Sequence, residues 1–136
     1  MKWTEEAAKA YYEHRAAKKL AQEQAAEEYK KHKVIQQRVK ELANTLMLNN
    51  QTVAANKLDI DALFQILQTT DASRAWLPPT MPPDVEAAVA VVGDMNSSFW
   101  TNEGIVQQLE VMVQSQSNFI STQQEMIAIL HMMMQQ

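Results

Sequence analysis

The chain has 136 residues, a net charge of -4 at pH 7 and no cysteine. The length fits a single domain of ordinary size, and the lack of Cys excludes disulfides and thiolate metal sites. The chain contains two Gly and four Pro, and all four Pro lie within residues 78–83. So few helix-breaking residues predict few turns and long helices.

Residues 1–48 are expected to form one long N-terminal helix. Thr4 is a suitable N-cap, and Glu5 and Glu6 complement the positive end of the helix dipole. The first thirty or so residues carry few large apolar side chains, which is typical of an exposed arm that depends on helix propensity. A short packing seam follows, at Ile35, Val39, Leu42 and Leu46 and then at Asn49 and Val53. An end or bend is predicted at Asn49-Asn50, because Asn favours capping conformations.

Residues 49–77 are expected to form a short helical middle, and residues 78–83 a Pro-rich connector. The connector contains Pro79-x-x-Pro82 but has no flanking basic residue, so we interpret it as a stiff spacer and not as an SH3-type ligand. Asp84 is expected to cap the helix that opens the C-terminal segment, residues 84–136. The last helix of that segment is expected to be capped by Thr101 or Asn102.

An apolar stripe runs along this last helix and is the strongest pattern in the sequence. Its members recur at heptad positions a, d and e, which predicts a helix that other helices must cover. Two a positions hold amides, Gln116 and Gln123, which are expected to bond to another Gln or to a backbone carbonyl across the interface. If so, changing both to Leu should raise stability and alter the copy number. If these positions instead face water, in a lumen or at a wide seam, the same change should leave the copy number alone and lower solubility. The predicted oligomer interface comprises Ile105, Val106, Leu109, Met112, Val113, Gln116, Phe119, Ile120, Gln123, Met126, Ile127, Leu130, Met133 and Met134.

The charge is distributed unevenly along the chain. Residues 1–43 contain ten Lys or Arg against seven Glu, a net charge of +3, and residues 44–136 contain two against nine acidic residues, a net charge of -7. This asymmetry allows basic and acidic parts of different copies to attract each other. The densest basic group is a candidate contact for a partner or a nucleic acid, although interleaved Glu residues argue against direct nucleic-acid contact. The group consists of Lys30, Lys31, Lys33, Arg38 and Lys40.

The sequence offers no recognisable catalytic or metal-binding motif. His14, His32 and His131 stand in no local catalytic signature, and two Gly residues cannot form a phosphate-binding loop. The Met-rich end of the chain is interpreted as adaptable core filler. We therefore expect no catalytic residues, no cofactor and no metal. The acidic start lacks the apolar run of a signal peptide, and no apolar run reaches the length of a membrane-spanning helix.

These patterns predict an all-α protein in which long extended helices, joined by the Pro-rich connector, form a helical-bundle or coiled-coil-like assembly. The function we expect is that of a non-enzymatic structural subunit that binds copies of itself and other proteins of a larger assembly. A virion or a secretion-type assembly would suit such a subunit, by analogy alone. One alternative is a conduit whose C-terminal amphipathic helices contact a membrane and line a channel. Another is a helical chaperone or scaffold for a partner protein.

Overall fold

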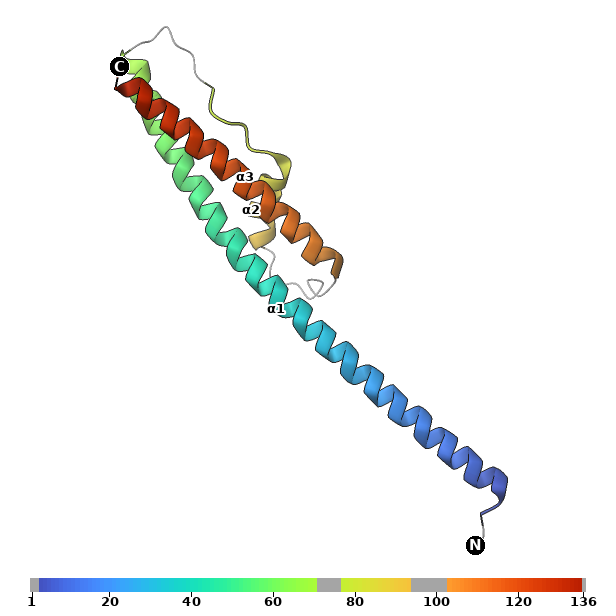
Figure 1. The fold of residues 1–136 in the computed structure, drawn as a ribbon. Helices are drawn as coiled ribbons and strands as arrows, with labels where there is room; N and C mark the ends of the chain where they lie inside the picture. The colour runs from blue at the N-terminus through green and yellow to red at the C-terminus, as the bar shows by residue number, and fades with distance from the viewer. Residues whose placement is uncertain (1–2, 71–76, 94–102, 136) are drawn as a thin grey trace.

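The computed structural model describes residues 3–70, 77–93 and 103–135 and contains three helices. They are α1 (Glu5–Thr70), α2 (Pro83–Gly93) and α3 (Glu103–Met134). Figure 1 shows α2 and α3 lying against the C-terminal half of α1, while its N-terminal half extends alone. The described residues form no strand, so the predicted all-α class is confirmed.

Helix α1 has 66 residues and is about 99 Å long at 1.5 Å per residue. Its start matches the predicted cap, because the Thr4 hydroxyl accepts a hydrogen bond from the Ala7 amide at 3.1 Å. The bend predicted at Asn49-Asn50 is wrong, since α1 continues unbroken through both residues. Their side-chain amides donate to Gln116 and to the carbonyl of Ala88 on other helices, and so support packing where capping was expected.

Helices α1 and α3 run parallel to each other. Asn49 bonds to Gln116, and seven residues further along both helices Asn56 bonds to Gln123. The C-terminus accordingly lies beside the end of α1 in Figure 1. A parallel pair needs a long return connection, and the chain between residues 71 and 102 provides it.

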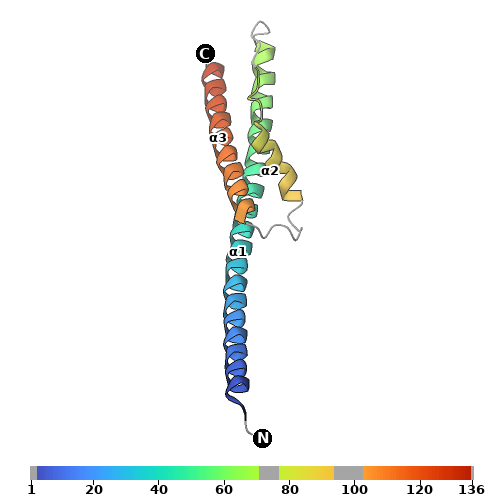
Figure 2. The same ribbon diagram turned by 90° about the vertical axis from the view of Figure 1, so that its right-hand side faces the viewer.

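The return connection contains α2, which runs antiparallel to the other two helices. Near its start Val85 packs at the level of Val53, and one turn later Ala88 packs at the level of Leu46. Figure 2 shows α2 on one side of the α1–α3 pair. Pro83 is the first helical residue, a position that tolerates its missing N–H.

Unlike the cap predicted at Thr4, the other two predicted helix caps are not confirmed. Asp84 was expected to cap α2, but it lies inside the helix and accepts a hydrogen bond from the Ser115 hydroxyl of α3 at 3.3 Å. The amides of Val85 and Glu86 instead donate to the carbonyl of Pro82. The cap expected at Thr101 or Asn102 lies outside the described residues.

Three apolar clusters form the core, one after another along the α1–α3 pair. The first joins α1 and α3 with Ala88 of α2, the second contains Val53, Val85 and Phe119, and the third joins the ends of α1 and α3. All three lie at or beyond residue 35 of α1. We call residues 35–70 of α1 together with residues 77–93 and 103–135 the body, and residues 5–34 the arm.

Among the described residues, no helix packs against the arm. Of its side chains only that of Ala8 is half-buried, and the others are exposed. The exposed group includes Tyr11, Tyr12, Leu20, Tyr29 and Val34. Near the tip, the rings of Trp3 and Tyr11 lie edge to face with their centroids 5.0 Å apart. The arm therefore presents aromatic and charged side chains together at one end of the molecule.

Candidate functional site

The apolar stripe of α3 packs against α1 of the same chain. Leu109, Gln116 and Leu130 are fully buried, and Gln123 and Phe119 are almost so. The predicted d and e positions around them are half-buried, apart from Met134, which is exposed. Association of copies through these residues stays a prediction. Within one chain, however, α1 already covers the buried members of the stripe.

Gln116 is the centre of a buried polar layer that joins all three helices. Its Nε2 donates to the carbonyl of Leu46 at 3.0 Å and to Oδ1 of Asn50 at 2.8 Å, while its Oε1 accepts from Nδ2 of Asn49 at 3.1 Å. Asn50 in turn donates to the carbonyl of Ala88 on α2 at 3.3 Å. Gln116 thus uses both of its N–H groups and its carbonyl, as a fully buried amide requires.

A second layer of the same design lies one heptad further along. The Nε2 group of Gln123 donates to the carbonyl of Val53 at 3.1 Å, and its Oε1 accepts from Nδ2 of Asn56 at 3.3 Å. Gln123 is 2 % exposed, so these bonds lie almost wholly out of water. The partner expected for each Gln, a backbone carbonyl across a helix interface, is therefore present, and it belongs to the same chain.

The two amide layers, centred on Gln116 and Gln123, separate the three apolar clusters and fix the register of α1 against α3. If α3 slid by one heptad in either direction, one Gln would leave its Asn partner and face an apolar cluster. A buried amide without a partner costs about 1–3 kcal/mol. A polar a-position residue selects one register in the same way in coiled coils.

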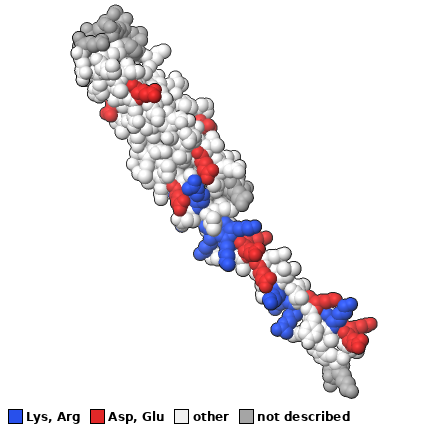
Figure 3. Space-filling model, in the orientation of Figure 1, with Lys and Arg blue, Asp and Glu red and all other residues white. Residues whose placement is uncertain are grey.

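The predicted basic group lies at the junction of arm and body. Lys30, Lys31 and Lys33 are exposed on the arm, with Lys33 stacked over the Tyr29 ring. Figure 3 shows Lys and Arg interspersed with acidic residues over the N-terminal half of α1, whereas the body is mostly uncharged on the face shown.

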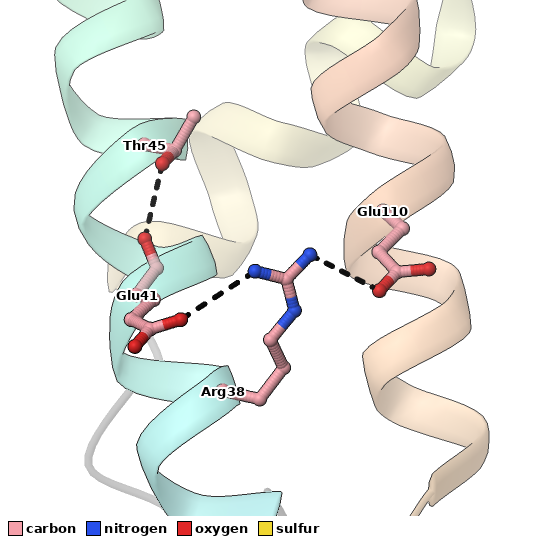
Figure 4. Close-up of polar contacts among 4 residues, drawn as sticks. All are labelled: Arg38, Glu41, Thr45 and Glu110. Atoms are coloured by element: carbon pink, nitrogen blue, oxygen red, sulfur yellow. Dashed lines mark hydrogen bonds and ion pairs between the residues drawn. The ribbon is translucent and has the colours of Figure 1, made fainter.

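Arg38, a member of this basic group, bridges α1 and α3. Its guanidinium lies 3.5 Å from the Glu41 carboxylate and 3.3 Å from that of Glu110, as Figure 4 shows. All three side chains are about half exposed. Pairs as exposed as these contribute at most about 1 kcal/mol each. Arg38 is therefore engaged within the chain, while Lys40 is exposed beside it.

The three His residues are exposed and far apart in the sequence, and His32 lies 3.4 Å from the Gln36 amide. Within the described ranges, no three His, Cys, Asp or Glu side chains are grouped as a metal site would require. No helix of the described chain has an apolar stretch long enough to cross a membrane.

Two surface cavities flank the extended segment of residues 77–82, which precedes α2. The first, of about 200 Å³, is lined by Lys57, Ile60, Pro78, Pro79, Met81, Phe119 and Gln123. This volume is below the range usual for small-molecule sites, about 300–1,000 Å³. The second, of about 350 Å³, is open and is lined by Pro79, Thr80, Pro82, Ser115, Asn118, Phe119 and Thr122, none of which is ionisable.

Comparison of the chain with protein-family models, with curated proteins and with solved structures finds no match. The candidate sites therefore rest on the geometry of this chain alone. They are the α1–α3 interface with its amide layers and the exposed surfaces of α1.

The residues that the sequence interpretation missed are Asn49, Asn50 and Asn56. Asn49 was placed at the end of the packing seam and, with Asn50, at a helix end, and Asn56 was not considered, yet all three supply the side-chain partners of the buried Gln residues. A signal was present, because Asn49 and Asn56 are spaced by seven residues, as are Gln116 and Gln123. Equal heptad spacing of amides on two seams indicates that the seams pair in one register.

Proposed function

We propose that the protein is a non-enzymatic structural subunit that associates with copies of itself in an elongated helical assembly. The observation that carries this proposal is the arm. It is a helix of thirty residues that extends beyond the body and leaves aromatic and aliphatic side chains exposed. An isolated helix gains little from propensity alone, and such a helix is stabilised when another surface covers it.

The charge distribution supports association between copies. The arm carries seven Lys or Arg against six Glu, a net charge of +1, and the body carries three Lys or Arg against eight acidic residues, a net charge of -5. Basic and acidic regions at opposite ends of one elongated molecule attract each other between molecules more than within one. A larger assembly such as a virion or a secretion-type structure is the setting we propose, by analogy.

The packing of the helices supports the two alternative functions, a conduit and a scaffold, to different extents. For the conduit, the apolar stripe of α3 would have to face lipid, but in this fold its central residues pack on α1. For the scaffold, the exposed arm could equally bind a different protein. Self-association and capture of a different protein are separated by the behaviour of the purified chain on its own.

Sedimentation velocity of the purified full chain, over about a hundredfold range of concentration, tests the proposal. We expect a mass above that of the 15.5 kDa monomer, rising with concentration and falling with added salt. A monomer at every concentration and salt level would contradict the proposal. Release of dye from lipid vesicles by the same sample would favour the conduit instead.

A further inference from the structure

Helix α1 carries a second seam on the side that faces away from α3. Its positions are two residues after Leu46 and two before Ile60, so they lie about 200° round the helix from these buried side chains. The outer seam, as we call it, consists of Asn44, Leu48, Gln51, Ala55, Leu58, Ala62, Gln65 and Thr69, which alternate at intervals of four and three. This alternation is the heptad spacing of a coiled-coil contact.

The outer seam is exposed and uncharged. All eight side chains are exposed within the chain, Leu48 by 56 % and Leu58 by 71 %. Met47 and Ile66 lie at its edges, 41 % and 46 % exposed. An exposed helix face normally carries many Lys and Glu residues. A face of Leu, Ala and amides suits contact with another helix, because Ala permits close approach and no charge has to be desolvated.

We propose that the outer seam binds the outer seam of a second copy, with the two α1 helices antiparallel about a two-fold axis. In this register Ala55 of each copy faces Leu58 of the other, so that a large side chain meets a small one on both sides of the axis. By the same register Gln51 faces Ala62, Leu48 faces Gln65, and Asn44 faces Thr69. Met47 then lies at the level of Ile66. An isologous contact requires this kind of self-complementarity.

The charges select the antiparallel arrangement over a parallel one. Continued into the arm, the seam positions hold Glu41, Gln37, Val34, Lys30 and Glu27, of which three are charged: Glu41, Lys30 and Glu27. A parallel pair in register would place each of these against its own copy, and like charges that face each other are destabilising. The antiparallel pair confines the contact to residues 44–69 and directs the two arms away from each other. At the seam edges, Asp59 lies at the level of Ala54 and Asp61 at that of Thr52, so these carboxylates do not meet.

The fold leaves room for this pair. Because α2 and α3 pack on the other side of α1, the two-fold pair has its two α1 helices in the centre and one α3 on each outer side. The product is a rod with a basic, aromatic-tipped arm at each end. This inference rests on the proposed self-association and names one surface, with its symmetry, through which two copies pair, while both arms stay free for further contacts.

Cysteine cross-linking tests the register directly, because the chain has no Cys of its own. Leu48→Cys and Gln65→Cys are made as separate proteins, mixed, and oxidised in dilute solution. The two positions are 17 residues apart, about 26 Å along one helix. Antiparallel pairing brings Leu48 of one copy next to Gln65 of the other, so the mixture forms a mixed disulfide while each protein alone does not. A mixture of Leu48→Cys with Ala128→Cys, an exposed position on α3, is the matched control.

A second variant measures the contribution of the seam to affinity. Leu58→Glu adds a charge at an exposed position, so the helical content of the monomer stays unchanged. The dissociation constant is expected to rise at least about tenfold, the factor that 1.4 kcal/mol represents. Ile129→Glu, at a similarly exposed apolar residue of α3, is expected to leave it unchanged.

The outcomes separate this inference from the proposed function. A mixed disulfide between residues 48 and 65, together with weakening by Leu58→Glu alone, supports it. Self-cross-linking of Leu48→Cys overturns the antiparallel arrangement. An oligomer that forms no cross-link at these positions and is unaffected by Leu58→Glu overturns the outer seam but leaves the proposed function standing. A monomer under all conditions overturns both.

Discussion

Nε2 of Gln116 on α3 lies 3.0 Å from the carbonyl oxygen of Leu46 on α1, and this hydrogen bond is fully buried. One heptad along, Gln123 makes the same bond to Val53 at 3.1 Å. The backbone of α1 is thus recognised twice by side chains of α3, at equal spacing. A parallel pair of helices can slide by whole heptads with little loss of apolar contact, so polar layers that recur in step are what select one alignment.

Replacement of Gln116 by Leu should destabilise the body by about 1–3 kcal/mol, because the side-chain amides of Asn49 and Asn50 lose a buried partner. The sequence alone suggested the opposite sign, since an amide at an a position normally costs stability. Urea unfolding followed by circular dichroism at low protein concentration measures the difference. Gln108→Leu, at an exposed position of the same helix, is the control and should change stability by no more than about 0.5 kcal/mol.

The second amide layer should behave as a coupled pair. Asn56→Leu leaves the buried Gln123 amide oxygen without its side-chain partner, and Gln123→Leu leaves the half-buried Asn56 amide without its own, whereas the double variant removes both groups. The loss in the double variant should therefore be smaller than the sum of the single losses by about 1 kcal/mol. Asn56→Leu combined with Gln116→Leu is the cross-layer control, for which the losses should add. Strict additivity for Asn56 and Gln123 would contradict the pairing.

Deletion of residues 1–30 should shift the melting temperature by less than about 3 °C, because the arm makes no core contact. The same deletion should reduce the association of full-length chains, because it removes the exposed Tyr and Leu side chains of the arm, whereas the six Lys or Arg and six Glu of residues 1–30 cancel in net charge. Thermal circular dichroism and sedimentation velocity measure the two effects. A large drop in melting temperature in a monomeric sample would show that the arm supports the fold.

Replacement of Glu110 by Gln should cost less than about 1 kcal/mol. The carboxylate lies 3.3 Å from the Arg38 guanidinium, but both side chains are about half exposed. Exposed ion pairs contribute little because water already solvates both charges. Urea unfolding at low and high salt checks this, and a loss comparable with that of Gln116→Leu would mean that the bridge anchors the start of α3.

The sequence predicted the all-α class, but it predicted neither the continuity of α1 nor the pairing of the helices, for a physical reason. The spacing of Leu109, Gln116 and Leu130 determines that one face of α3 is covered, but it does not indicate whether the covering helix belongs to the same chain. The seam at Val39, Leu42 and Leu46 was also visible in the sequence. Its pairing with α3 depends on the long connection through α2 that brings α3 back beside α1, and the spacing of apolar residues does not indicate this connection. At Asn49-Asn50, the side chains bond to Gln116 and to the carbonyl of Ala88, which lie 67 and 38 residues away in the sequence. The continuity of α1 depends on these distant partners, which local helix propensity does not take into account.

Replacement of Phe119 by Asp distinguishes packing within the chain from packing between chains. Phe119 is 7 % exposed and lies in the cluster with Val53 and Val85, so the variant places an unpaired carboxylate in the core of one molecule. A buried charge without a partner costs several kcal/mol, so the body of the monomer should lose cooperative thermal unfolding, even in a sample too dilute to associate. Val111→Asp, at a position of the same helix that is 55 % exposed, should unfold as the parent does. If Phe119→Asp instead keeps the melting temperature of the dilute parent and loses only its association, the stripe of α3 joins copies and is not the core of a single chain.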